Sequence, residues 1–521
     1  MGQTAVVFVF ALAARLLYLL SIRHADFFSH LLTEPQRYQQ WSAAIVGGAA
    51  RLRPPFDEAP AYPYLLAAVR VLFGPSVAAA AAMQAVLDAA SCAALALIAR
   101  RISGPRAAWI AATLSALYGP LIYFNGELVP ATLMVFAVAL ATLITLGAAR
   151  RRRGWVLAGA AWSAAILVRS ETVLALPLLG LYAYRVEGAR ALRRVAVVPA
   201  ALIAASLAVN VSVSRHWVPL TTGAGVNLWL GNNPLADGVN PFIHGSLRTA
   251  VADINARAHD PVEADTAFAR LAERFWREHP ASSFRLLVRK LMWTFTDREL
   301  PNTSDIDWQT SHSWMFHGPW FPLHFGVILP LGIAGVWLLW KRRDTHLILL
   351  ASPVAIAVAT SALCFTNARF RLVLVVALIP LAAHAIDETA CLLRQWRDHA
   401  RTGASLGMAM GLGVLVSAVD FDGVKRYAVP QIDVNTGALE RASGNTVSAI
   451  RYLERGVAGD PDDSAAWIQL ALAFEESGRI DRARATWAGA KAQFPSDALV
   501  RQMAARFVLR VEAAASRPPT H

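Results

Sequence analysis

The chain has 521 residues, of which 56% are hydrophobic and only 16% are charged, and its formal net charge at pH 7 is +13. An average soluble protein is about 45–50% apolar and about 25% charged, so this composition excludes a disordered chain and argues against an ordinary soluble enzyme. Basic residues cluster between apolar blocks, which indicates membrane topology and no nucleic-acid partner.

Apolar blocks recur along the chain and predict about eleven transmembrane helices, since about 20 residues suffice to cross a bilayer. The first block, residues 5–22, follows a start that lacks the basic region of a signal peptide, so we expect a retained helix. The other blocks are residues 76–99, 107–124, 128–149, 155–168, 171–184, 195–211, 320–340, 346–365, 371–386 and 404–419. The predicted fold class is an all-α polytopic membrane protein.

The segments between these blocks predict the orientation. Basic segments occur at residues 100–106, 150–153, 185–194, 341–343 and 394–401, and under the predicted alternation all of them fall on one side. Short basic loops stay cytoplasmic, so we expect a cytoplasmic N-terminus and an extracytoplasmic tail in the bacterial inner (plasma) membrane. Outer loops are then expected at residues 23–75 and 212–318.

Two stretches of these outer loops predict helices that do not span. Residues 62–74 are apolar but too short to cross a bilayer, which is typical of a helix in the membrane interface. Residues 261–279 show amphipathic helical spacing.

The tail has the pattern of a helical repeat. Trp467, Gly478 and Pro495 occupy signature positions of the tetratricopeptide repeat, whose period is about 34 residues. One period earlier, Leu453 and Pro461 occupy matching positions of a degenerate copy. We therefore divide the chain into a membrane domain, residues 1–420, and a repeat region, residues 430–515. Because about three repeats are needed to bury a core, the tail should pack on the membrane domain, on a partner or on another copy of itself.

Charged residues gather at the predicted outer ends of the helices. They are Arg15, Glu34, Arg37, Glu127, Arg169, Glu171, Arg369 and Arg371. A charge near a membrane helix is costly and often functional, and arginine forks with carboxylates suit a phosphate-bearing substrate. The alternative is snorkelling to the headgroups, which we favour for Arg15 and weigh equally for Arg169, with Glu171 as a counter-charge.

Metal binding and disulfides are not expected. His24, His30 and His279 have no second ligand at helical spacing, so no metal site is predicted. The three cysteines lie far apart on predicted helices.

Short motifs on the predicted outer side occur in a familiar order. They are Glu34-Pro35-Gln36-Arg37-Tyr38, Tyr62-Pro63-Tyr64, Asn125-Gly126-Glu127, Leu167-Val168-Arg169, Gly231-Asn232-Asn233-Pro234, His279-Pro280 with Lys290, and Arg369-Phe370-Arg371. Over about residues 5–390 the chain resembles the GT-C membrane glycosyltransferases, in the bacterial branch related to protein O-mannosyltransferases and lipid A aminoarabinose transferases.

The resemblance implies transfer of a sugar from a polyprenyl-phosphate carrier to an acceptor hydroxyl at the outer membrane face, with inversion and without a cofactor. By position it makes Glu34 the catalytic base and Glu127 a second acid that orients the acceptor or the base. The basic residues it offers to the lipid phosphate are Arg169, Arg369, Arg371 and, less strongly, Lys290. Arg37 and Tyr38 are expected to fix the loop. The acceptor can be a protein, a lipid or a glycan, and the repeats suggest a protein partner.

One departure from the family pattern leaves alternatives open. The family has an aspartate and a second acid before x-Arg-Tyr, whereas this chain has Glu34 and a proline. Either the loop has shifted, or Asp26 or Asp57 is the base, or catalysis is weakened. The last case admits a non-catalytic scaffold that recruits envelope partners through the tail. A transporter is less favoured, because the chain lacks two similar halves.

Overall fold

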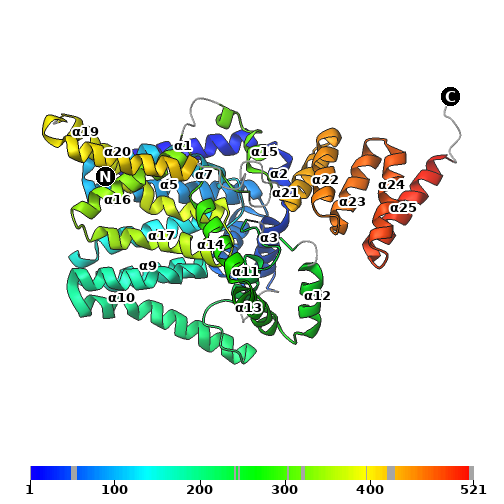
Figure 1. Cartoon of the computed structure of the whole chain (residues 1–521), viewed down its shortest axis with the longest axis horizontal. Helices are drawn as coiled ribbons and strands as arrows, with labels where there is room; N and C mark the ends of the chain where they lie inside the picture. Colours follow the sequence, from blue (N-terminus) through cyan, green and yellow to red (C-terminus); the bar gives the residue numbers. More distant parts are fainter. Residues whose placement is uncertain are drawn as a thin grey trace.

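In the computed structural model, the residues described are 2–48, 56–239, 242–243, 247–301, 304–317, 323–394, 396–418 and 429–515. Every regular element in these ranges is a helix, so the predicted all-α class is confirmed. Apolar helices form a bundle, and the loops predicted to lie on the outer side, called the outer loops below, gather at one end of it, with the tail extending beyond them (Figure 1). The N-terminus lies at the other end of the bundle (Figure 1).

Several helices are suited to cross a membrane. Five segments are long and apolar enough: α1 (Gly2–Ile22), α5 (Val77–Ser103), Ser170–Ser214 with α10 (Leu176–Ser214), α17 (His346–Leu363), and Ala368–Cys391 with α18 (Ala368–Arg371) and most of α19 (Val375–Arg394). Other helices also lie in predicted spans: α6 (Pro105–Ala116), α7 (Gly119–Tyr123), α8 (Ala131–Leu146), α9 (Gly154–Val168), α16 (Phe325–Lys341) and α20 (Trp396–Ala418). The chain is a multi-pass membrane protein, and the number of spans stays a prediction.

A kink divides α10 where the sequence predicts a basic loop between two spans. Glu187 and Gly188 have non-helical backbone angles, and Gly188 has a φ of 71°, which glycine adopts without a steric penalty. The arginines around this kink are exposed.

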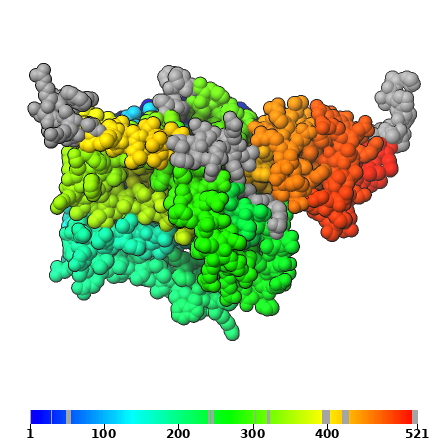
Figure 2. Space-filling view, viewed as in Figure 1, coloured from blue at the N-terminus to red at the C-terminus, as the bar shows by residue number. Residues whose placement is uncertain are grey.

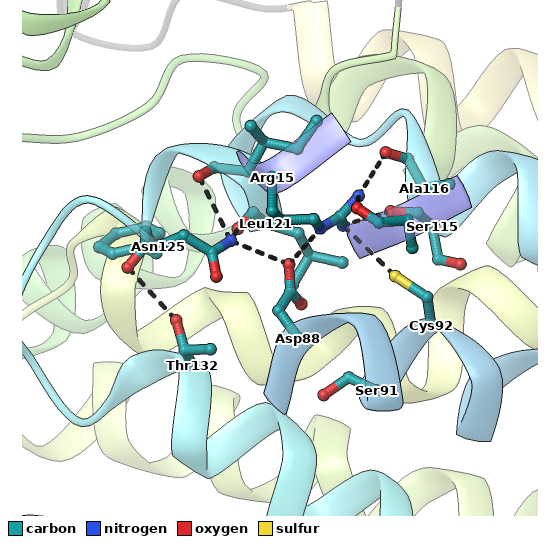
Figure 3. Close-up of polar contacts among 12 residues, drawn as sticks. Arg15, Asp88, Ser91, Cys92, Ser115, Ala116, Leu121, Asn125 and Thr132 are labelled. Carbon is teal, nitrogen blue, oxygen red and sulfur yellow. Dashed lines mark hydrogen bonds and ion pairs between the residues drawn. The ribbon is translucent and has the colours of Figure 1, made fainter. Parts of the chain in front are cut away.

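The expectation that Arg15 snorkels to the headgroups is wrong. Arg15 is fully buried, and its Nε donates to Asp88 Oδ2 at 2.8 Å (Figure 3). The same guanidinium donates to the carbonyls of Ala116 at 2.6 Å and Ser115 at 3.0 Å, which end α6 and lack helical partners. Helix packing therefore gives Arg15 a counter-charge inside the bundle, so its side chain has no need to reach the headgroups.

The outer loops contain several short helices. They are α2 (Asp26–Ser29), α3 (Thr33–Val46), α4 (Ala61–Phe73), α11 (Ala224–Leu230), α12 (Leu247–Arg257), α13 (Pro261–Glu278), α14 (Pro280–Thr294) and α15 (Ile306–Thr310). α4 and α13 match the two helices predicted here, and α4 exposes Val71, Leu72 and Phe73. The membrane-interface position of α4 stays a prediction.

The tail folds as stacked helical pairs with the predicted period. Its helices are α21 (Pro430–Ala442), α22 (Thr446–Gly459), α23 (Ser464–Glu476), α24 (Ile480–Gln493) and α25 (Ala498–Ala515). Of the three packing alternatives left open for the tail, the structure shows the first. Arg248 Nη2 in α12 contacts Asp460 Oδ2 of the tail at 2.6 Å, and the tail projects from the end of the bundle that carries the outer-loop helices (Figure 2).

Candidate active site

Three chain segments bring an acid and two arginines together at the loop end of the bundle. Glu34 lies in the first turn of α3, Arg169 directly follows α9, and Arg369 lies in α18. Asn367 caps α18, with its side-chain oxygen accepting from Phe370 N at 3.0 Å. Thr33, directly before Glu34, has a φ of 47°, a strained conformation for a β-branched residue that recurs at functional sites.

Both arginines are paired with carboxylates. Arg369 Nη1 donates to Glu34 Oε2, and Arg169 Nε lies 2.5 Å from Glu171 Oε1, as expected for a counter-charge. Both guanidinium groups lie over the ring of Phe370, whose centroid is 4.9 Å from Cζ of Arg369 and 5.0 Å from Cζ of Arg169. These cation–π contacts help to position the two cations.

A small pocket opens beside these arginines. Its lining residues are Ala131, Met134, Arg169, Glu171, Ile356, Thr360, Arg369, Phe370 and Val373. The apolar members come from α8, α17, α18 and the turn after α18, so the lining combines apolar side chains of predicted membrane helices with charged side chains. This combination suits a ligand with an anionic head and an apolar chain.

The environment favours the ionised form of Glu34. Burial alone would raise the pKa of its carboxyl, but the guanidinium of Arg369, with smaller contributions from Arg169 and Arg37, holds this pKa below its usual value. The group is therefore a carboxylate at neutral pH, as a general base must be.

Glu127 lies in the turn between α7 and α8 and is buried. Tyr123 Oη donates toward Glu127 Oε1 at 3.4 Å, and Gln84 Nε2 donates to the Glu127 carbonyl at 2.9 Å. Burial raises the pKa of this carboxyl, hydrogen bonds from Gln309 and Tyr123 oppose the shift, and the charge of Glu34 adds to it. The two acids therefore have opposite tendencies, a pattern typical of acid–base pairs.

The turn that carries Glu127 is anchored inside the bundle by the Arg15 network. Asn125 Nδ2 donates to Asp88 Oδ2 at 3.0 Å and to the carbonyl of Leu121 at 2.7 Å, so Asp88 links Arg15 to this turn (Figure 3). Gln84 continues the network, since its Oε1 accepts from Tyr62 Oη at 2.9 Å.

Arg37 and Tyr38 both contact segments that follow α3 in the chain. Arg37 forms an ion pair with Glu58, which joins α3 to the segment before α4. The buried ring of Tyr38 packs edge-on against Tyr62 at a centroid distance of 5.0 Å.

Two predicted phosphate ligands do not line the pocket. Arg371 Nη2 contacts Glu299 at 2.8 Å, its Nη1 donates to the Thr296 carbonyl, and its guanidinium lies over Phe325. Lys290 Nζ donates to Asn232 Oδ1 at 2.9 Å and to a carbonyl of α17 at 3.2 Å. Both side chains fasten the outer loop to the bundle. None of the acids Glu34, Glu127, Asp26 and Asp57 lines the pocket, but Glu34 contacts its lining through the ion pair with Arg369.

Sequence reasoning missed Asp88, Glu58 and Phe370. Of these three residues, only Asp88 has a sequence pattern that points to a role, because it is a charge inside an apolar block. Phe370 lies between two arginines of a motif, and nothing in the motif indicates a role for its ring. Within the described ranges, no group of three or more His, Cys, Asp or Glu residues is arranged to hold a metal ion.

Family models match two parts of the chain. Residues 57–213 match the family described as dolichyl-phosphate-mannose-protein mannosyltransferase. Residues 440–507 match a tetratricopeptide repeat. The predicted resemblance is confirmed. The first match, to the mannosyltransferase-like region, supports glycosyl transfer as the class of reaction, and the second identifies the tail as tetratricopeptide repeats. No curated protein matches the chain.

Solved structures with distant similarity include two membrane transferases. Archaeal oligosaccharyltransferase AglB from Archaeoglobus fulgidus, in complex with an inhibitory peptide and a dolichol-phosphate, has 15% identity and a TM-score of 0.42, with 79% of this chain and 55% of that chain covered. ArnT from Cupriavidus metallidurans, bound to undecaprenyl phosphate, has 15% identity and a TM-score of 0.42, with 93% and 80% covered. The chain thus spans about half the length of AglB.

Proposed function

We propose that this chain is a glycosyltransferase that moves a sugar from a polyprenyl-phosphate carrier to an acceptor hydroxyl. The reaction is an inverting displacement at the outer face of the bacterial inner membrane, with the N-terminus cytoplasmic and the repeats outside. The observation that carries this proposal is the pocket in which Arg169 and Arg369 meet apolar side chains of membrane helices.

The phosphate of the donor lipid would bind to the guanidinium groups of Arg169 and Arg369, which both line the pocket. Arginine offers a planar fork that matches two phosphate oxygens, and charge-assisted bonds of this kind are stronger than neutral ones. The first isoprene units would then lie against the apolar lining residues Met134, Ile356 and Val373. Neither the arginines nor the apolar residues alone would select a lipid phosphate, but the two sets together do.

Binding of that phosphate would also change Glu34. In the free pocket the carboxylate of Glu34 is the anion that Arg369 holds. A phosphate that takes over Arg369 removes this partner, and the pKa of Glu34 then rises because burial is no longer opposed to the same degree. Glu34 becomes a stronger base when the donor is in place, and it can take the proton of the acceptor hydroxyl as that oxygen attacks the anomeric carbon. The bond from the sugar to phosphate breaks, and the arginines stabilise the leaving group.

Glu127 is suited to orient the acceptor or the base. Its charge interacts with both Glu34 and Arg369, so it lies close enough to influence the reacting groups. Protein, lipid and glycan hydroxyls remain open as acceptors, and the tetratricopeptide tail is available to a protein partner.

Transfer from a labelled polyprenyl-phosphate sugar tests the proposal. In cell membranes that contain the full-length protein and supply the acceptor hydroxyls, polyprenyl phosphate should be released, and Glu34→Gln should lower the rate at least 100-fold, since general base catalysis contributes about 10²–10⁴-fold. Glu278→Gln is the matched control, because Glu278 is an exposed acid of α13. Full activity of both Glu34→Gln and Glu127→Gln would refute the assigned acids. Absence of transfer by the wild type from a panel of such donors, with partners still retained by the tail, would favour the scaffold.

A further inference from the structure

A five-residue helix of the outer loop, α15, connects the repeat tail to the candidate active site. Adjacent residues of α15 face the two sides: Gln309 contacts the surroundings of Glu127, and Trp308 contacts α21 of the tail. Nothing in the proposed reaction uses either residue, although both are buried.

On the site side, Tyr123 and Gln309 control the surroundings of Glu127. Tyr123 Oη donates to Gln309 Oε1 at 2.5 Å and lies 3.4 Å from Glu127 Oε1. The tyrosine has one proton, so Gln309 and the carboxylate compete for it. Gln309 Nε2 in turn donates to Ser304 Oγ at 2.5 Å, which fixes the orientation of its amide.

On the tail side, α21 holds α15 by polar and apolar contacts. Trp308 Nε1 donates to Glu440 Oε1 at 2.6 Å, and Asp305 N, at the cap of α15, donates to Thr436 Oγ1 at 3.2 Å. The Trp308 ring packs edge-on against Phe27, and Leu439 of α21 belongs to the same buried cluster. A tryptophan that is buried and hydrogen-bonded to a buried carboxylate has little freedom to move.

We propose that Gln309 is a positioning residue for Glu127 and that the tetratricopeptide tail, through the Glu440–Trp308 contact, keeps it in place. The role of Glu127 in this inference rests on the proposed function. The physical link from α21 through Trp308 and Gln309 to Glu127 does not depend on that function. According to this proposal, the tail acts within its own chain. α21 holds α15 in position, and α15 in turn determines whether Tyr123 donates its hydrogen bond to Gln309 or to Glu127.

Three substitutions in the full-length protein test the link. Gln309→Leu removes the competing acceptor, Trp308→Phe removes only the indole N–H, and Glu440→Gln keeps an acceptor oxygen for Trp308. Trp487→Phe is the matched control, since Trp487 is also buried and its Nε1 donates to Glu475 at 2.7 Å within the tail, away from α15.

Hydrogen exchange of residues 119–130, followed by mass spectrometry, reads the link without any substrate. We expect Trp308→Phe and Gln309→Leu to speed this exchange about 5-fold to 100-fold, the equivalent of leaving one buried group unsatisfied. Glu440→Gln and Trp487→Phe should stay within twofold of wild type. Unchanged exchange in both Trp308→Phe and Gln309→Leu, or an equal effect of Trp487→Phe, would overturn the proposal.

The pH dependence of sugar transfer supplies the second readout. Gln309→Leu should shift the profile, because Glu127 loses the hydrogen bond from Gln309 and the Tyr123 proton then serves Glu127 alone, while Trp487→Phe should leave the profile unchanged. Altered exchange with an unaltered profile would overturn the positioning role of Gln309. Altered exchange in a protein whose wild type transfers no sugar would leave the link intact and refute the proposed function instead.

Discussion

The buried ion pair of Arg15 and Asp88 can be tested by removing its partners separately and together. Asp88→Leu leaves the Arg15 guanidinium with only carbonyl and thiol acceptors, and Asn125 loses an acceptor as well. Removing one partner of a buried pair costs about 3–5 kcal/mol, whereas replacing both with apolar side chains is often close to neutral. We therefore expect Asp88→Leu to destabilise the bundle by about 3–5 kcal/mol and Arg15→Met with Asp88→Leu to restore most of the loss.

Cys92 supplies the assay, because its buried Sγ lies 3.3 Å from Arg15 Nη2. In a background with Cys364→Ser and Cys391→Ser, a thiol reagent reaches Cys92 only when the region opens. A loss of about 3–5 kcal/mol in the free energy of opening corresponds to an increase of about 10²- to 10³·⁵-fold in the population of the open state. The labelling rate of Asp88→Leu should rise by a factor of this order.

Thr142→Val is the matched control for this experiment. Thr142 is fully buried, and its hydroxyl has no hydrogen-bond partner within the ranges that the structure describes, so its loss should change labelling little. Labelling of Asp88→Leu at the wild-type rate would refute the ion pair. So would a double variant that loses as much stability as the two single variants combined.

Three further predictions concern the pocket and the tail. Arg369→Gln should weaken binding of polyprenyl phosphate in detergent at least tenfold, since a hydrogen bond to a charged group contributes about 1.5–3 kcal/mol, whereas Arg371→Gln should lower thermal stability and spare binding. Arg369 lowers the pKa of Glu34 in the free enzyme, so kcat/KM of the wild type should fall only below the usual carboxyl range, and Arg369→Gln should move this acidic limb to higher pH. Burial raises the pKa of Asp433 from 3.8 to about 6, so the folded tail binds this proton more tightly than the unfolded chain does. The tail is therefore destabilised as pH rises between these two values. Hydrogen exchange of residues 430–442 should speed up over this pH interval in the wild type, and less so in Asp433→Asn.

The helices and the repeat were predictable because their signals are local. Each apolar block contains its own evidence for a helix, and α21, α23 and α25 begin one repeat period apart at Pro430, Ser464 and Ala498. The gathering of acids and arginines at one end of the bundle was also predictable, because these residues flank the apolar blocks in the sequence.

The pairings were not predictable from local signals. Glu34 and Arg369 are 335 positions apart, and only helix packing brings them into contact. Arg371 lies two residues after Arg369 and carries the same charge, yet it faces Glu299 on the other side of a short helix. Charge and motif predict correctly which end of the bundle such residues occupy. The direction of each side chain, however, depends on contacts with segments that are distant in the sequence.

The Arg15–Asp88 pair also constrains how the protein is made. The partners are 73 residues apart, so at about 5–20 residues per second the ribosome synthesises Asp88 about 4–15 s after Arg15. During that interval α1 contains a cation without its counter-charge, which disfavours insertion by about 2.5–3.5 kcal/mol. Stable insertion of α1 then depends on α5 joining it, so the first helix of the chain should remain next to the translocon until the next long span emerges.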